Sequence, residues 1–534
     1  MTAHDNSRTA SGKHLWIVGG GIAGMAAAAF AIRDAGVAGS NVHILEESGL
    51  PGGSLDGAKS PTLTDGWVTR GGRMLEDEAY LCTWDLFSSI PSQGNPQVSV
   101  RDEITAFNKH VPTHANARLF GRDHTILPAA DYGFDTRDRL ELGRLIASPE
   151  STLADKRIDQ MFGKHFFSTN FWQMWRTTFA FQNWHSAIEL RRYFLRFVQE
   201  FSRINTLSGV RRTVYDQYDS MVLPLHLWLG LHDVDFRFGQ RVVDAAFTNG
   251  VDRRIARLSV ETDQGHADID LGDDDIALLT LGSITSDSTY GGQDTPPELI
   301  RSHRDHGWSL WETVAQKAPD FGHPEVFLNV DENKWESFTL TMHDSVLLDR
   351  IVNLADNKPG TGALMTWVDS GWLMSIVVPH QPHFPHLPAG DSTLWGYGLL
   401  VDKLGDHVPK TMAASSGREI LTELIGQLEF DSILDHVLET TDVTTVMMPY
   451  ASAVFSPRAP GDRPLVIPDG STNFGFLGQF TEIPEDVVFT VEYSIHGAMQ
   501  AVYTLLDVDR AIPGIYHGAF HPSVDLHAIE SAFK

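Results

Sequence analysis

The most constraining feature of this sequence is a glycine-rich turn near its start, Gly19-Gly-Gly-Ile-Ala-Gly24. The turn follows a short apolar run at residues 14–18 and opens an alanine-rich segment with helical composition. A second apolar run at residues 42–45 ends in Glu46, which lies 22 positions after the last glycine of the turn. Strand, glycine turn, helix and acidic strand end, in this order, are typical of a dinucleotide-binding unit in a parallel sheet. The sequence therefore predicts an α/β fold built on a doubly wound, Rossmann-like sheet.

The residue types in this turn fit the contacts that a dinucleotide requires. Gly19 permits the tight turn, Gly21 lets the backbone approach a pyrophosphate, and Gly24 lets the helix pack closely on the sheet. Phosphates are favoured at a helix N-terminus, and the Glu46 carboxylate is able to accept hydrogen bonds from ribose hydroxyls. The alternative is a glycine-rich turn without a ligand, which the flanking strands and the acidic residue disfavour.

Composition excludes several classes of protein. At 534 residues the chain is long enough for three or four domains, and 42% apolar with 21% charged residues is typical of a globular protein. A net charge of −28 disfavours nucleic acid as a partner. The single cysteine, Cys82, excludes an intrachain disulfide, a Cys-ligated zinc site and a dithiol redox pair, and we interpret it as a small buried hydrophobe. The polar N-terminal segment and the lack of a long apolar run predict a cytoplasmic protein.

Aromatic residues are concentrated in residues 165–201, where 12 of 37 residues are Phe, Trp or Tyr, against 10% in the whole chain. Trp172, Trp175 and Phe179 are spaced as on one face of a helix, and so are Phe194 and Phe201. The segment therefore predicts apolar helices that could line a tunnel for an elongated apolar molecule.

Several later segments favour FAD over NAD as the dinucleotide. Pro51-Gly-Gly-Ser-Leu55 follows the acidic strand end, and Arg70-Gly-Gly-Arg73 adds an arginine-flanked glycine pair that suits a second phosphate and a flavin. Residues 276–281 predict another buried strand, and a Gly-x-Phe strand precedes a helix at 490–506. The predicted FAD-binding residues are Gly19, Gly21, Ala23, Gly24, Glu46, Glu47, Ser54, Leu55, Arg70, Gly71, Gly72, Arg73, Val242, Ser283, Gly478 and Ser494.

With these motifs in place, the sequence resembles the oleate hydratases, FAD-dependent fatty acid hydratases that are also called myosin-cross-reactive antigens. The resemblance extends over nearly the whole chain and is carried by residues 19–25, 70–73, 82–92, 171–172, 184–193, 215–221, 381–384 and 490–494. It implies addition of water to the cis double bond of an unsaturated long-chain fatty acid, with FAD required but no net redox. Trp172 and Phe179 are then expected to contact the acyl chain.

The resemblance also implies catalytic residues, and here the sequence departs from the family. Tyr193 matches the tyrosine proposed to protonate the alkene, and the alternative is a packed aromatic with its hydroxyl on a backbone carbonyl. The family glutamate proposed to activate water is replaced by Met74, whose thioether is not a base. Either other groups hold the water, or an acidic residue in 76–78, foremost Glu76, substitutes for it. The alternative is that residues 76–78 form a solvated acidic loop.

The carboxylate-binding motif of the family is also altered. Gln217 and His383 match proposed carboxylate contacts, whereas Val377 and Pro379 replace a threonine and an asparagine. His380, His383 and His386 do not predict a metal site, because prolines break the segment and no carboxylate joins them at ligand spacing. The sequence thus leaves open how an acidic protein captures an anionic fatty acid.

Together these features predict one FAD-binding domain into which a helical and mixed substrate domain is inserted. The FAD-binding domain is assigned to residues 12–95, 205–290 and 440–510, the substrate domain to 96–204 and 291–439, and a C-terminal tail to 511–534. The alternatives to a hydratase are an FAD-dependent oxidoreductase of the desaturase or amine oxidase type and a fatty-acid-binding flavoprotein without turnover. Weak peripheral membrane contact is a separate hypothesis, and a monomer and a homodimer both remain open.

Overall fold

A computed structural model describes residues 12–518, except for 56, 73, 124, 249, 251, 303 and 304. Its first layer is a five-stranded sheet in the order β19-β12-β1-β2-β8, in which all neighbouring strands are parallel. The strands are β1 (Leu15–Val18), β2 (Val42–Glu46), β8 (Asp235–Phe238), β12 (Ile276–Thr280) and β19 (Phe474–Leu477). The predicted parallel sheet is therefore confirmed, and segments far apart in the sequence build it.

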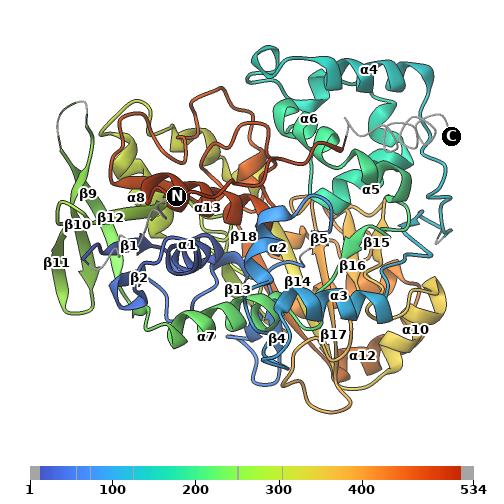
Figure 1. The fold of residues 1–534 in the computed structure, drawn as a ribbon. Coiled ribbons are helices and arrows are strands. Elements are labelled where there is room, and N and C mark those ends of the chain that lie inside the picture. The colour runs from blue at the N-terminus through green and yellow to red at the C-terminus, as the bar shows by residue number, and fades with distance from the viewer. Residues whose placement is uncertain are drawn as a thin grey trace.

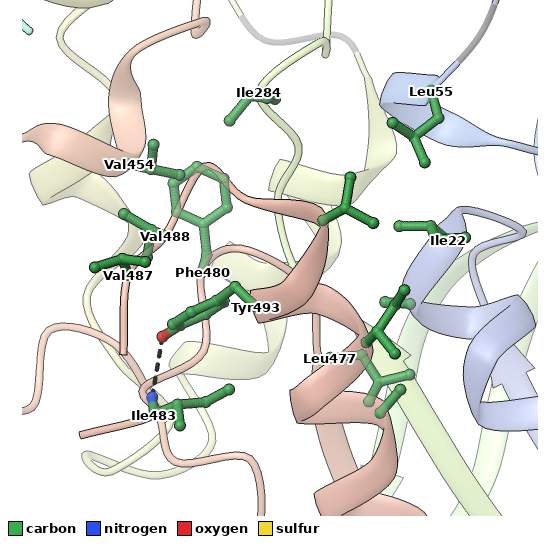
Figure 2. Packing of buried hydrophobic residues seen from close by; sticks show 14 of the residues in the cluster. Ile22, Leu55, Ile284, Val454, Leu477, Phe480, Ile483, Val487, Val488 and Tyr493 are labelled. Carbon is green, nitrogen blue, oxygen red and sulfur yellow. Dashed lines mark hydrogen bonds between the residues drawn. The ribbon is translucent and has the colours of Figure 1, made fainter. Parts of the chain in front are cut away.

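Helices α1 (Ile22–Arg33) and α13 (Val491–Leu505) pack against each other beside this sheet (Figure 1). The small side chains of residues 26–29 are buried and leave room for close packing. Gly24 has the same function, since a Cβ atom there would lie 2.1 Å from the Gly19 carbonyl oxygen. Figure 2 shows Ile22, Leu477 and Tyr493 in one continuous core. The sequence predicted both helices, and the prediction of 490–506 agrees with α13 to within one residue at each end.

A smaller antiparallel sheet flanks the parallel one and lies at the left of Figure 1. It consists of β9 (Arg241–Phe247), β10 (Ile255–Thr262) and β11 (Gly265–Asp270), and helix α8 (His306–Ala315) packs on β9. Helix α7 (Leu223–Leu231) packs against α1.

The second large layer is a seven-stranded sheet in the order β13-β18-β14-β17-β16-β15-β6. Its pairs are antiparallel except for β15 with β6. The strands are β6 (Leu119–Phe120), β13 (Thr289–Gly291), β14 (Trp335–Met342), β15 (Leu364–Trp367), β16 (Met374–Val377), β17 (Ser392–Gly398) and β18 (Thr441–Met448). Strand β18 belongs to this sheet although the sequence analysis assigned residues 440–510 to the FAD-binding domain. The two-domain division stays a prediction, and the sheets do not follow its boundaries at β13 and β18.

Two short ribbons connect the layers. Strands β3 (Gly57–Lys59) and β4 (Trp67–Thr69) form one, and β5 (Leu75–Glu76) with β7 (Val210–Arg211) forms the other. The amides of Trp67 and Thr69 donate to the hydroxyls of Thr341 and Thr339 on β14, at 3.1 and 3.2 Å. These contacts attach the β3–β4 ribbon to the seven-stranded sheet.

Helices cover the rest of the seven-stranded sheet. Helices α10 (Val346–Ala355), α11 (Gly417–Gln427) and α12 (Leu434–Thr440) share a second core with it. Helices α4 (Thr136–Ala147), α5 (Asn170–Phe179) and α6 (Ala187–Arg196) group at the upper right of Figure 1. The remaining helices are α2 (Leu81–Phe87), α3 (Val100–His110) and α9 (Val330–Asn333).

The aromatic segment forms helices, as predicted, but with one correction. Trp172, Trp175 and Phe179 all lie on α5. The expected helical run from Phe194 to Phe201 breaks, because α6 ends at Arg196 and a tight 3₁₀ turn follows from Val198 to Arg203. The described residues include no helix both long and apolar enough to cross a membrane.

Candidate functional site

A cavity of about 570 Å³ lies at the carboxyl ends of the parallel strands, where ligands bind in open α/β sheets. We call it the glycine-lined cavity, because the loops that follow β1, β12 and β19 enclose it with Gly19, Gly282 and Gly478. Most of the predicted FAD-binding residues line it, namely Gly19, Gly21, Ala23, Glu46, Glu47, Ser54, Arg70, Val242, Ser283, Gly478 and Ser494.

Backbone geometry explains why glycine occupies these positions. Gly19 has a φ of +100°, and a Cβ atom there would lie 3.0 Å from the Thr280 side chain. Gly21 caps α1 without a side-chain hydrogen bond and pairs with Gly52 of the second glycine loop. The first amides of α1 therefore face a cavity at the positive end of the helix dipole, which suits a phosphate.

The acidic end of β2 is held by its neighbours. The Glu46 carboxylate accepts hydrogen bonds from the Gly20 amide at 2.6 Å and from the amide and hydroxyl of Ser48 at 2.8 and 2.7 Å. Burial, together with the nearby Asp305 carboxylate, raises the pKa of Glu47 to about 7. The hydroxyl of Thr280, which also lines the cavity, is buried and has no hydrogen-bond partner among the described residues.

Five predicted FAD-binding residues do not line this cavity. Gly24 is buried between α1 and the sheet, while Leu55 and Gly71 are buried elsewhere. Gly72 lines two other cavities, and Arg73 lies outside the described residues. The Arg70 guanidinium donates to the carbonyls of Gly53 and Thr285, at 2.8 and 3.2 Å. Arg70 thus lines the glycine-lined cavity, and Gly72, two residues further on, lines the two smaller ones.

The first of these, the aromatic cavity, has a volume of about 110 Å³. Aromatic and aliphatic side chains dominate its walls, and Tyr193, Met74 and Phe179 are among them, as predicted. The full lining is Gly72, Met74, Tyr80, Thr177, Thr178, Phe179, Ala180, Tyr193, Phe197, Arg212, Trp335, Leu364, Val377, Trp395, Tyr397, Phe489, Thr490 and Val491. Trp172 is absent from it, because its indole packs on Phe166 and Phe167 and donates to Asn183 at 3.1 Å.

Tyr193 lies on α6 with its ring against Phe179 and Phe181, at centroid distances of 5.2 and 5.0 Å. Its hydroxyl donates to the Val488 carbonyl oxygen at 2.7 Å. Burial raises the pKa of this phenol well above its ordinary value, so the group carries its proton throughout the physiological range. Tyr193 therefore lines an apolar cavity and also makes the backbone contact expected of a packed aromatic.

Glu76 does not line the aromatic cavity. Its carboxylate accepts hydrogen bonds from the Ala79 amide at 2.7 Å and from Gln199 at 2.6 Å, and it lies 3.5 Å from the Arg203 guanidinium. Burial and the nearby Glu200 carboxylate raise the pKa of Glu76 to about 8. Glu76 is 4% exposed, so the alternative of a solvated loop does not describe it.

The description of a solvated acidic loop fits the two residues after Glu76 instead. Asp77 and Glu78 are exposed and pair with Arg211 and Arg203, at 2.8 and 3.5 Å. Cys82 is buried, and burial raises the pKa of its thiol, in keeping with its interpretation as a small hydrophobe.

The third space, the histidine cavity, measures about 50 Å³ and adjoins the aromatic cavity, sharing Gly72, Arg212, Val377 and Trp395 with it. It is lined by both predicted carboxylate contacts, Gln217 and His383, and by Val377 and Pro379. Thr69, Thr213, Gly360, Gly362 and His380 complete the wall.

Several residues that line the small cavities were not identified from the sequence. Arg212 lines both small cavities, and Tyr397 and Trp395 line the aromatic one. Arg212 lies three residues before the segment 215–221 that carries the resemblance, which was the available signal for it. Tyr397 and Trp395 lie on β17, and nothing in their local sequence marks them, because pairing with β16 and β14 brings them to the cavity.

Comparisons with known proteins agree on one family. The sequence pattern of the MCRA family matches residues 12–503. The oleate hydratase of Streptococcus pyogenes serotype M49 (strain NZ131) is 39% identical over 536 residues, covering 98% of this chain and 89% of the relative. The linoleate hydratase of Lactiplantibacillus plantarum is 35% identical, covering 91% of this chain and 92% of the relative.

Solved structures show a shared fold at low sequence identity. Cyclohexylamine oxidase from Brevibacterium oxydans IH-35A matches with a TM-score of 0.51 and 12% identity, over 93% of this chain and 99% of that one. Putrescine oxidase bound to putrescine matches with a TM-score of 0.50 and 11% identity, over the same fractions.

Proposed function

Because this chain belongs to the MCRA family, we propose that it is a fatty acid hydratase, which adds water across the cis double bond of oleic acid or a similar unsaturated free fatty acid. The product is a hydroxy fatty acid. The observation that carries this proposal is the similarity to two hydratases over more than 90% of this chain. The aromatic cavity agrees with it, because an acyl chain needs an apolar environment.

We infer that FAD is the cofactor and that it undergoes no net redox change. The size of the glycine-lined cavity, the exposed helix N-terminus and the unpartnered Thr280 hydroxyl fit a dinucleotide. Gly19 and Gly21 would approach the pyrophosphate, Glu46 the ribose, and Arg70 and Ser494 the part nearest the aromatic cavity. When bound, FAD would shape and polarise the adjoining substrate site.

The proposed reaction requires a proton donor in a dry cavity. Tyr193 would transfer its phenolic proton to one alkene carbon, and the oxygen of a water molecule would bond to the other. Loss of a proton from that oxygen then restores the phenol, so the net reaction adds one water. An isolated alkene is a poor base, so the apolar walls matter because they keep bulk water from competing for the proton.

The nucleophilic water has no carboxylate beside it within the described lining of the aromatic cavity. Met74 occupies the position of the family glutamate, and Glu76 is held by Ala79 and Gln199 away from this lining. Orientation of the water therefore replaces base catalysis in our proposal. A cation that develops next to a water molecule requires little assistance from a base.

The product of oleic acid tests this function directly. Protein loaded with FAD is incubated without oxygen or another electron acceptor in water enriched in oxygen-18, and the fatty acids are analysed by mass spectrometry. A hydratase yields a product heavier by one labelled water. Product without that label, or a requirement for an acceptor, would favour the flavin oxidoreductase, and bound but unchanged oleic acid would favour the binding protein.

Cellular location and assembly belong to the same proposal. We expect a cytoplasmic enzyme. Because fatty acids reside in bilayers, we also expect it to contact the membrane surface, but only weakly. Cosedimentation with anionic vesicles tests the contact, and strong binding would contradict it. Light scattering distinguishes a monomer from a homodimer, both of which the proposed reaction allows.

A further inference from the structure

The charge lining the two small cavities is positive. No aspartate or glutamate appears in the described lining of either cavity, whereas Arg212 belongs to both. Burial lowers the pKa of Arg212 to about 10, which still leaves the guanidinium charged at neutral pH. A permanent cation therefore lies where the aromatic cavity meets the histidine cavity.

The backbone and side chain of Arg212 are both fixed. Its amide donates to the Asn108 side-chain oxygen at 3.0 Å, and the Asn108 amide group donates to the Arg212 carbonyl at 2.7 Å. The guanidinium donates to the Gly362 carbonyl at 2.8 Å. Gly362 has a φ of +68°, and a Cβ atom there would lie 2.6 Å from Arg212 Nε, so the loop approaches the guanidinium as only glycine allows. The site is preorganised.

The other polar residues of the histidine cavity cannot supply positive charge. Burial, with contributions from His380 and Arg212, lowers the pKa of His383 to about 4, so the imidazole is neutral at pH 7. The side-chain amide of Gln217 donates to the Thr69 hydroxyl at 3.2 Å and to the Gly71 carbonyl at 2.8 Å, which directs it to the 69–71 loop. Val377 offers no side-chain donor.

Two further guanidinium groups extend the positive region. Arg118 is buried and Arg176 is half-buried, and the charges of both act on the Tyr397 phenol, as that of Arg212 does. Among the described residues, neither Arg118 nor Arg176 forms a salt bridge with a carboxylate. A charge of −28 on the whole chain thus coexists with a local positive potential that attracts an anion.

We propose that Arg212 binds the carboxylate of the fatty acid in the histidine cavity, with the acyl chain extending into the aromatic cavity. This inference rests on the proposed hydratase function. Arginine suits the role because its planar fork matches the two oxygens of a carboxylate. Neutral His383 would add one N–H donor, while Gln217 would position the loop at 69–71. Arg212 would then replace the donors lost at Val377 and Pro379.

The test compares Arg212→Gln and Arg212→Lys with the wild type on oleic acid and on methyl oleate. The matched control is Arg211→Gln, because Arg211 is the preceding residue but pairs with Asp77 at the surface and lines neither cavity. We expect Arg212→Gln to lower kcat/KM for oleic acid about 10- to 100-fold, mainly through KM, since a hydrogen bond to a charged group is lost. Activity on the uncharged ester should change less than about threefold, and Arg212→Lys should retain part of the activity on the acid.

Unchanged KM for oleic acid in Arg212→Gln would overturn the proposal. So would an equal loss on the acid and the ester in a variant with normal FAD content and melting temperature, since that pattern indicates a structural role. Quenching of tryptophan fluorescence by oleic acid provides a second measurement, because Trp395 lines both cavities. If the wild type turns over neither substrate, the hydratase proposal fails, and weaker binding of oleic acid to Arg212→Gln still decides the role of Arg212.

Discussion

Replacing Tyr193 by phenylalanine separates a proton donor from a packed aromatic. The substitution keeps the ring contacts with Phe179 and Phe181 and removes one hydroxyl, whose hydrogen bond to Val488 measures 2.7 Å. Loss of one such bond should lower the free energy of unfolding by about 0.5–1.5 kcal/mol. Loss of a general acid should lower kcat about 10²- to 10⁴-fold, which corresponds to about 3–5 kcal/mol in the barrier.

The two effects are measured on the same variant, by mass spectrometry of the product from oleic acid and by thermal unfolding. Tyr493→Phe is the matched control, because Tyr493 is also buried and its hydroxyl donates to the Thr481 carbonyl at 2.6 Å, but it lines none of the three cavities. The Tyr493 hydroxyl also accepts from the Ile483 amide at 3.0 Å, so its removal should cost at least as much stability. We expect the control to keep kcat within about twofold of the wild type, as substitutions away from the reacting groups do.

Tyr193→Phe with more than about a tenth of the wild-type kcat would refute the assignment, since a missing general acid costs more than that. Tyr397 is then the alternative donor, because it lines the same cavity and its hydroxyl donates to the Thr177 carbonyl. A large loss of kcat in Tyr397→Phe, together with an active Tyr193→Phe, would identify Tyr397 as the proton donor.

Four further predictions follow from the same geometry. Met74→Glu should raise kcat about tenfold or more by placing a base in the lining, and an unchanged kcat would mean that the water lies elsewhere. Glu76→Gln should leave kcat within about twofold, because Glu76 lines none of the three described cavities. Since the pKa of Glu76 rises from 4.5 to about 8 on folding, its contribution to stability is complete below pH 4.5 and is lost as the pH rises through 8. The wild-type melting temperature should therefore decrease as the pH rises from 6 to 8.5. An equally steep decrease in Glu76→Gln would contradict this. Glu46→Ala should lower the flavin absorbance per protein after gel filtration, and full retention would exclude Glu46 from the cofactor site.

The parallel sheet was predictable because its signals are local. Strands β1, β2, β12 and β19 are short, mostly apolar runs, and the turn at 19–24 combines glycine with a helix start, so periodicity and turn chemistry agree. Strand β8 was not predicted, because it alternates charged and aromatic residues. The seven-stranded sheet was not predicted in detail, since its strands alternate in sequence with helices and pair over long distances, as β14 does with β18. The break after Arg196 was missed for a related reason: aromatic spacing reports burial, and a 3₁₀ turn buries Phe201 as well as a helix would.

The candidate site was predictable where a motif is contiguous and not where distant strands build it. Gln217 and His383 were placed in one cavity by resemblance, and the structure brings them together. Trp172 was expected at the substrate because it shares a helix face with Phe179, but it lies about two turns nearer the N-terminus of α5, against Phe166 and Phe167. Arg212 could not be distinguished from Arg211 by sequence, because only the end of β7 decides which of them turns toward the cavities.

The absence of a carboxylate from the described lining of the aromatic cavity bears on how the proposed reaction handles positive charge. Protonation of an alkene creates a cation, and a nearby carboxylate could trap it as an ester. Aromatic faces, here those of Trp335, Trp395 and Phe179, stabilise a cation without forming a bond to it. A site with Met74 in place of glutamate therefore lacks a base that activates the water, but it also lacks a carboxylate that could capture the cation as an ester. In such a site the position of the water relative to the double bond sets the rate, and the anchored carboxylate at Arg212 would fix that position by holding one end of the chain.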